Sequence, residues 1–391
     1  MNDHFECIVI GAGIEGSAAA YTLAKNGRHT LLLEKFPLPH TRGSSHGATR
    51  ITRIAYPAAT PVYSQMMLDA FRLWTQLEHE CARQLYRKTG LLWVGLKSRG
   101  EQRAAYERMK HVYGVPCALL DAPEIRARYP QLKYTDDFEA LYEDQAGMLF
   151  ANKCLRAFQD EFVKHGGTLR DAESVLSARA GQPVRVYTAK GTYTTDKLIC
   201  CLGTWAAPFL RENFQLNLPL QPQVLKATYW PNDTNSHSVE RGFPCLIAED
   251  HQDHLYGLPN FEYPGLFKFC MHVGWPGDPD KRDSLTAEQI DDQINKSKRH
   301  IRRYFVDIDA RQPAIAETCM YTMTPTSNAF IDVHPLYSNI VIAAGFSGHG
   351  FKLAPVVGEV LLDFAIGRRP KYDMTIFKIP KSAATSNNAK M

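Results

Sequence analysis

The sequence lacks several features that would place it in a special class of protein. It has no apolar run of about 18 residues, so no membrane-spanning helix is expected. Its nine cysteines form no CxxC pair, and an odd count that includes the adjacent Cys200 and Cys201 fits free thiols in a reducing compartment. The N-terminal segment, Met1 to Glu6, has neither a basic start nor an apolar stretch, so no secretory signal is expected.

Two further absences limit the chemistry. The sequence contains no HExxH motif and no Cys/His or carboxylate cluster, so no metal site is predicted. It has no basic stripe interleaved with aromatic residues, and a net charge of +4 is mild for 391 residues. Nucleic acid is therefore not an expected partner.

The composition that remains is that of an ordinary globular protein. Hydrophobic residues make up 45% and charged residues 22% of the chain. At about 150 residues per domain, this length predicts two or three domains. Such a chain can bury a large core without the support of a metal or of disulfides.

The chain opens with a strand–helix–strand unit. The apolar run Cys7–Ile10 predicts a buried strand, and a helix of small residues follows until Asn26 and Gly27 end it. Thr30–Leu33 predicts the next strand, with Glu34 at its end. The whole unit is a βαβ motif of the kind that binds nucleotides.

The turn of this unit is a GxGxxG motif. Gly11 allows the tight turn, Gly13 lets the backbone approach a pyrophosphate, and Gly16 lets the helix meet the strand. The helix N-terminus offers free N–H groups to the phosphates. Glu34 is placed to bind both ribose hydroxyls of an adenosine, and its charge disfavours a 2′-phosphate. The motif predicts a dinucleotide but does not separate FAD from NAD.

The rest of the chain predicts two kinds of region. Helices are expected over 63–87 and 154–165, and strands over 184–187 and 198–202. The segment 216–323 reads as a mostly antiparallel sheet interrupted by one helix over 286–305. A strand over 340–344, three glycines and an apolar helix follow. This late return to the nucleotide domain favours FAD over NAD, because the flavin ring must be held far from the adenine.

These elements predict an α/β fold (α+β overall) with a Rossmann-like FAD-binding domain and a substrate domain on a mostly antiparallel sheet. We expect residues 1–88, 148–218 and 324–391 to form the FAD-binding domain, and residues 89–147 and 219–323 to form the substrate domain.

Four segments carry a resemblance to a known family. They are Pro39–Gly47 with Arg50 and Arg53, Leu255–Pro259 extended to Lys268, Cys319–Thr322, and Gly345–Lys352. With them, the sequence resembles the monomeric sarcosine oxidase family of flavoprotein amine oxidases from Ile8 to about Phe377. The resemblance is strongest to the animal, peroxisomal branch, which includes L-pipecolate oxidases. It departs from that branch at Ala48 and Met323.

The resemblance implies FAD held covalently through a cysteine thioether to the flavin 8α-methyl. Cys319, followed by Met320, stands at that position. The alternative for Cys319 is a buried structural thiol. The resemblance also implies cofactor contacts by further residues: Lys35, Ser44, His46, Thr49, Val175, Gly203, Trp205, Gly348, His349, Gly350 and Lys352.

The resemblance further implies a set of residues that act on the substrate. Arg50 and Lys352 would bind the substrate carboxylate, with Arg53 structural or a second positive charge near the ring. Lys268 would promote the reaction with oxygen, because a fixed ammonium stabilises superoxide. Tyr256 and His272 would line the pocket and orient the amine. The alternative for each is an ordinary core or surface residue.

The implied activity is an FAD-dependent oxidase of secondary-amine amino acids, with L-pipecolate first and sarcosine or L-proline next. It would convert the C–N bond to an imine and reduce O2 to hydrogen peroxide. The alternatives are an oxidase of fructosyl or other N-substituted amino acids, a flavin-binding scaffold or redox sensor, and an NAD-dependent dehydrogenase. The absence of Trp-Asp after Cys319 disfavours the fructosyl branch.

The C-terminal residues Ala389, Lys390 and Met391 fit the small–basic–Leu/Met pattern of a peroxisomal address. We therefore expect recognition by the peroxisomal import receptor and a peroxisomal location, with a cytoplasmic location as the alternative. The expected partners are the amino acid substrate and O2, without nucleic acid or membrane, and the expected state is a monomer.

Overall fold

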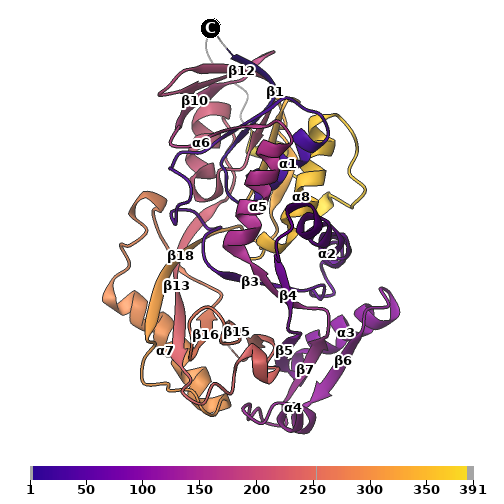
Figure 1. Cartoon of the computed structure of the whole chain (residues 1–391), viewed down its shortest axis with the longest axis vertical. Helices are drawn as coiled ribbons and strands as arrows, with labels where there is room; N and C mark the ends of the chain where they lie inside the picture. The colour runs from indigo at the N-terminus through magenta and orange to yellow at the C-terminus, as the bar shows by residue number, and fades with distance from the viewer. Residues whose placement is uncertain (1–2, 252, 385–391) are drawn as a thin grey trace.

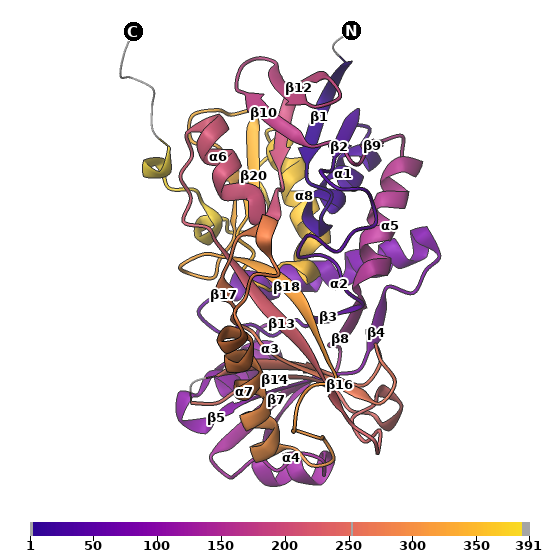
Figure 2. The same cartoon turned by 90° about the vertical axis from the view of Figure 1, so that its left-hand side faces the viewer.

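The computed structural model of the chain describes residues 3–251 and 253–384. Two sheets lie at opposite ends of an elongated molecule, and two long strands connect them (Figures 1 and 2). The eight helices of the described residues are α1 (Ile14–Lys25), α2 (Pro61–Cys81), α3 (Glu101–His111), α4 (Ala122–Arg128), α5 (Ala151–Lys164), α6 (Ala206–Phe214), α7 (Ala287–Tyr304) and α8 (Ala354–Ala365).

The first sheet has a parallel core. Its strands β1 (Asp3–Ile10), β2 (Thr30–Leu33), β9 (Thr168–Arg170), β12 (Thr192–Cys200) and β20 (Ile340–Ala344) run parallel in the order β9-β2-β1-β12-β20. Antiparallel strands extend it, namely β10 (Val175–Arg179) and β11 (Val184–Thr188) beside β12, and β19 (Phe330–Val333) beside β20. The predicted Rossmann-like unit is confirmed, and strands from two distant parts of the chain, 168–200 and 330–344, complete its sheet.

Alternating side chains cover the two faces of this sheet. Val9, Leu32, Ile199 and Val341 pack with α1, α5 and α8 on one face. Ile8, Leu31, Leu198 and Ile340 pack with α6 on the other face. A parallel sheet covered on both faces reads as continuous apolar runs, which is why its strands were recognisable in the sequence.

The second sheet has nine strands and is mostly antiparallel, as predicted. Its order is β17-β13-β16-β15-β14-β5-β7-β6, with β18 beside β13, and β14 with β5 is the parallel pair. The strands are β5 (Leu91–Leu96), β6 (Cys117–Asp121), β7 (Phe138–Glu143), β13 (Gln221–Pro231), β14 (Cys245–Glu249), β15 (His254–Leu258), β16 (Leu266–Met271), β17 (Trp275–Pro276) and β18 (Ile315–Met323).

A small third sheet lies between the other two in the figures. It pairs β8 (Gly147–Phe150) with β3 (Thr49–Thr52) and β4 (Tyr86–Lys88). The helix predicted over 63–87 therefore ends early. It stops at Cys81, Ala82 takes a left-handed conformation, and the chain enters β4.

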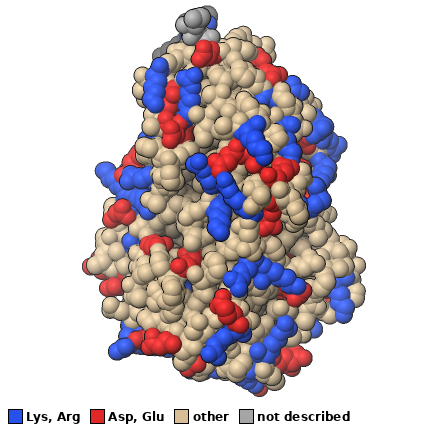
Figure 3. Space-filling view, in the orientation of Figure 1, with Lys and Arg blue, Asp and Glu red and all other residues tan. Residues whose placement is uncertain are grey.

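The surface carries no field of one sign on the face drawn in Figure 3, where basic and acidic side chains are interspersed. Within the described residues, no helix is both long and apolar enough to span a bilayer. The residues of the predicted C-terminal address, 389–391, lie outside the described residues.

Candidate active site

A cavity of about 1310 Å³ lies at the carboxyl ends of β1, β2, β12 and β20. This is the edge of a doubly wound sheet where ligands bind. The glycine turn, the loop after β2, α5, the segment after β12, β18 and the segment after β20 all contribute to its lining. Its volume exceeds the roughly 300–1,000 Å³ of most ligand pockets, which suits a ligand as long as a dinucleotide.

The glycine turn forms the floor of one end. Gly11 and Gly13 line the cavity, and Ile14 N–H donates to Ser45 Oγ at 2.9 Å. Gly16 does not line it; a Cβ there would lie 1.9 Å from the carbonyl oxygen of Gly11. Only glycine lets α1 approach the turn so closely, so the role predicted for Gly16 in helix–strand packing fits the geometry.

Glu34 lies beside this turn with its carboxylate fixed. One oxygen accepts a hydrogen bond from Ala12 N–H at 2.9 Å. The other oxygen accepts from Phe36 N–H at 3.0 Å and lies 3.3 Å from His40 Nε2. Burial alone would raise the pKa of Glu34, but His40 and the two backbone donors hold it below its ordinary value. The ionised carboxylate lines the cavity where a ribose would lie.

Trp205 and Lys35 close the same end of the cavity, where Val175 and Gly203 also line it. Asp280 accepts from Trp205 Nε1 at 3.0 Å and from Lys35 Nζ at 3.1 Å. Asp280 comes from the second half of the chain and was not predicted from the sequence, because nothing local marks it.

The segment after β20 lines the other end through Gly348, Gly350 and Phe351. A Cβ on Gly348 would lie 2.5 Å from the ring of Tyr321, so glycine there admits the tyrosine. His349 does not line the cavity; its Nδ1 lies 3.2 Å from the hydroxyl of Tyr56.

Cys319 lies on β18 and is a free thiol of intermediate burial. Successive side chains of a strand point to opposite faces, so Cys319 shares its face with Glu317 and Tyr321. Both of those residues line the cavity. The adjacent Met320 is fully buried on the opposite face.

Arg50 lines the cavity, but its guanidinium is already bound to backbone. Nη1 donates to the carbonyl of Thr49 at 2.8 Å, and Nη2 donates to the carbonyls of Ser44 and His46. It also lies over the ring of Phe351 at 5.5 Å. These contacts hold the loop that carries Ser44 and His46, which both line the cavity.

Arg53 lies apart from the cavity, in a cationic cluster that it forms with Lys352. Its guanidinium lies 4.9 Å from the ring of Tyr56 and 5.0 Å from the ring of Trp93. Within the described residues, Arg53 Nη1 and Trp93 Nε1 are buried donors with no hydrogen-bond partner. Lys352 Nζ lies 5.0 Å from the same Tyr56 ring and donates to the carbonyl of His349 at 3.0 Å.

The charges in this cluster act on one another. Burial and the charge of Arg53 hold the pKa of Lys352 well below its ordinary value, against the opposing effect of Glu143. Glu143 is fully buried and accepts from Ile54 N–H at 2.7 Å and Ala55 N–H at 2.9 Å. Glu143 therefore fixes the backbone that follows Arg53. Burial raises the pKa of Glu143 to about 7, although these two donors, Arg53 and Lys352 oppose the shift.

His272 and Tyr256 lie close to this cluster. The ring of His272 is 5.4 Å from Tyr321, 6.3 Å from Tyr256 and 4.6 Å from His254. Burial, reinforced by His254, His349 and the two cations of the cluster, holds the pKa of His272 well below its ordinary value, so the ring is neutral. Tyr321 links the two regions, because it also lines the large cavity.

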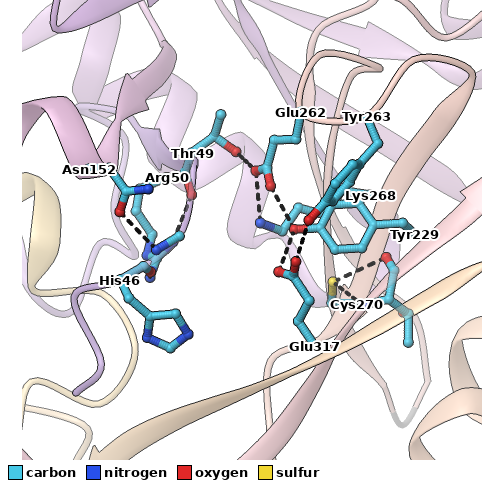
Figure 4. A network of polar contacts seen from close by, with 12 residues as sticks. His46, Thr49, Arg50, Asn152, Tyr229, Glu262, Tyr263, Lys268, Cys270 and Glu317 are labelled. Atoms are coloured by element: carbon cyan, nitrogen blue, oxygen red, sulfur yellow. Dashed lines mark hydrogen bonds and ion pairs between the residues drawn. The ribbon is translucent and has the colours of Figure 1, made fainter. Parts of the chain in front are cut away.

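Lys268 and Thr49 belong to a third group of residues, drawn in Figure 4. Lys268 Nζ donates to Glu262 at 2.9 Å, and Thr49 donates to the same carboxylate. Glu262 lines the cavity, whereas Lys268 and Thr49 do not. Glu262 was missed in the sequence, although it lies within the segment that carried the family resemblance.

The comparisons with known proteins agree with this architecture. Residues 6–364 match the family described as FAD dependent oxidoreductase (DAO). The chain belongs to this family. It is 40% identical over 383 residues to the peroxisomal sarcosine oxidase of Homo sapiens, with 97% of each chain aligned. It is 34% identical over 384 residues to the monomeric sarcosine oxidase of Bacillus sp. (strain NS-129), with 98% of each aligned.

The solved structures support the fold. NikD, described as an unusual amino acid oxidase essential for nikkomycin biosynthesis, superposes with a TM-score of 0.80 at 22% identity, over 97% of this chain and 98% of that chain. The protein is therefore an FAD-dependent amino acid oxidase of the sarcosine oxidase type, which acts on the CH–NH group of its donors. The glycine turn, the ionised Glu34 and the length of the cavity fit FAD.

Proposed function

We propose that this enzyme oxidises secondary-amine amino acids, with L-pipecolate as the first substrate and sarcosine and L-proline next. The C–N bond of the substrate becomes the C=N bond of an imine, and O2 is reduced to hydrogen peroxide. Two electrons leave the amine and two reach O2, so the reaction balances. The sarcosine oxidases among its relatives support a small N-substituted amino acid as the substrate class.

The observation that carries this proposal is the pair of buried cations Arg53 and Lys352. Arg53 Nη1 is a buried donor without a partner in the described part of the chain, and a substrate carboxylate would supply its acceptor. Arg50, which the sequence favoured for this role, donates instead to the carbonyls of Thr49, Ser44 and His46. We therefore assign the carboxylate to Arg53 and Lys352, and assign Arg50 to the loop beside the flavin.

The remaining residues orient the amine and the oxygen reaction. His272 is neutral, so a ring nitrogen of it can accept a hydrogen bond from the substrate amine. Tyr256 and Tyr321 flank it and give the pocket apolar walls. Bound FAD supplies the acceptor for the two electrons and their route to O2. Lys268 provides positive charge near the site where superoxide would form.

Cys319 is the residue that we propose links the flavin covalently. It shares the face of β18 with the cavity-lining residues Glu317 and Tyr321. Of the other eight cysteines, six are buried, and Cys81 and Cys117 are of intermediate burial. Only Cys201 of these eight lines the cavity, below the glycine turn. Cys319 does not itself line the cavity, but it lies on β18 between the lining residues Thr318 and Tyr321, and this position supports it as the linked thiol.

The location and organisation follow the same reasoning. We propose a peroxisomal monomer that the import receptor recognises through Ala389–Met391, since a peroxide-forming oxidase suits that compartment. Two domains with the boundaries given above are consistent with the sheets, because strands of the parallel sheet and of the nine-stranded sheet come from separate parts of the chain.

The test is anaerobic addition of L-pipecolate, sarcosine and L-proline to the yellow holoenzyme, each beside its carboxamide. The acid should bleach the flavin absorbance, and air should restore it with release of peroxide. The carboxamides should bleach it far more slowly, because they present no carboxylate to Arg53 and Lys352. Bleaching by fructosyl amino acids alone would show that the substrate class is fructosyl amino acids instead. A flavoprotein bleached by none of these amines would favour the scaffold or redox-sensor role.

A further inference from the structure

Glu262 lines the cavity, and the ammonium of Lys268, which does not line it, is bound to Glu262 (Figure 4). The two side chains form an ion pair at 2.9 Å, in which Lys268 is 7% exposed and Glu262 is 6% exposed. In Figure 4, Glu262 lies between Arg50 on β3 and Glu317 on β18. Any charge that Lys268 presents to the flavin therefore acts in the presence of a counter-ion.

The carboxylate of Glu262 is held from several elements. Thr49 on β3 donates to one oxygen, the same one that accepts from Lys268. Tyr229 on β13 donates to the other oxygen at 2.6 Å. Burial would raise the pKa of Glu262, but the charge of Lys268 and these hydrogen bonds hold it below its ordinary value. The carboxylate is thus ionised and fully occupied.

A second carboxylate lies beside this group without touching Lys268. Glu317 on β18 accepts from Tyr263, and it lies 3.2 Å from the hydroxyl of Tyr229. It also lines the cavity. Glu317 thus provides a neighbouring negative charge with no ion pair to the lysine, which makes it a matched comparison for Glu262.

A purely structural explanation of the Glu262–Lys268 pair is weak. Burying two charges costs desolvation energy that their attraction does little more than offset, so such pairs are poor stabilisers of a fold. Here the pair lies beside a ligand cavity, where the position and the net strength of one positive charge affect chemistry. The number of donors that converge on Glu262 also exceeds what neutralising a lysine requires.

We propose that Glu262 is a positioning residue that fixes the ammonium of Lys268 beside the flavin and limits how much of its positive charge the flavin experiences. This inference rests on the proposed function of Lys268 at the flavin. Thr49 and Tyr229 donate hydrogen bonds to Glu262, and these bonds reduce the negative charge that Glu262 presents to the lysine.

The experiment is a sulfite titration of the holoenzyme, followed by loss of flavin absorbance. Sulfite attacks oxidised flavin and leaves negative charge on the ring, so its affinity reports the local positive charge without any amine substrate. Glu262→Gln keeps the shape and removes the counter-charge. It should tighten sulfite binding by roughly tenfold or more, since one buried charge has been removed from beside the lysine. The midpoint potential of the flavin should rise in parallel.

The decisive comparison is made in a Lys268→Met background. Glu262→Gln removes a cavity-lining charge in either background. If Glu262 also acts through Lys268, the size of its effect on sulfite affinity should differ between the two backgrounds, whereas the effect of Glu317→Gln should be the same in both. Equal effects of Glu262→Gln with and without the lysine would overturn the proposal, as would unchanged sulfite binding in the single variant.

A second variant and the amine test distinguish failure of this proposal from failure of the proposed function. Should Glu262→Gln not fold, Tyr229→Phe removes one donor from the carboxylate, and the strengthened counter-charge should weaken sulfite binding; unchanged binding would overturn the proposal. Failure of every amine to bleach the enzyme would refute the proposed oxidase function, and the sulfite titration would still decide the role of Glu262.

Discussion

Replacement of Arg53 by methionine tests which arginine binds the substrate. Arg53 contributes a buried donor without a partner in the described residues, next to Lys352. A hydrogen bond from a charged group is worth about 1.5–3 kcal/mol, and loss of one partner from a buried charged pair costs about 2–5 kcal/mol. We therefore expect kcat/KM for L-pipecolate or sarcosine to fall roughly 100-fold to 1,000-fold. Much of the loss should appear in KM, because Lys352 alone holds the carboxylate less tightly.

Arg50→Met should behave differently. It removes hydrogen bonds to the carbonyls of Thr49, Ser44 and His46, so it should lower the flavin content and the thermal stability of the protein. Enzyme that retains flavin should keep a KM close to that of the wild type. The assays are steady-state peroxide release normalised to bound flavin, and melting temperature. A large rise in KM for Arg50→Met with little change for Arg53→Met would refute the assignment.

Two other predictions follow from single residues. Cys319→Ser should release its flavin on acid precipitation, whereas the wild-type pellet should stay yellow; a colourless wild-type pellet would exclude the thioether. Glu143 has its pKa raised to about 7 in the folded chain, above about 4.3 in the unfolded chain, so its contribution to stability is lost as pH rises between these values. Urea unfolding should therefore show a loss on the order of 3 kcal/mol from about pH 4.5 to pH 7 that Glu143→Gln abolishes; identical pH slopes for both proteins would contradict this.

The parts of the molecule that the sequence predicts are those that local chemistry determines. The βαβ unit was recognisable because its strand, its glycines, its helix and Glu34 lie within 34 consecutive residues. The helix predicted over 63–87 was too long, since Ala82 turns left-handed and β4 must pair with β8. That pairing partner lies about 60 residues further along the chain, where no local signal reaches.

The same distinction explains what was found of the site. Cys319, Lys268, Lys352 and His272 were predicted from the family resemblance, which also favoured Arg50 over Arg53 as the ligand of the substrate carboxylate. The two residues stand three positions apart, and their surroundings come from other elements: backbone carbonyls of the 44–49 loop for Arg50, and the rings of Tyr56 and Trp93 for Arg53.

Three carboxylates that the sequence left unmarked give the site its electrostatic arrangement. Glu143 lies behind Arg53 and Lys352, so when it is ionised this cluster carries one net positive charge, which a substrate carboxylate would neutralise. Glu262 forms an ion pair with Lys268, so in the role proposed for this lysine the charge offered to oxygen would be smaller than that of a free ammonium. Asp280 fixes Lys35 and Trp205 at the far end of the cavity. Lys268 and Lys35 thus have carboxylate partners, whereas Arg53 keeps a donor without one among the described residues, and the charge left over after pairing, rather than the number of cations, would set the affinity for an anionic substrate.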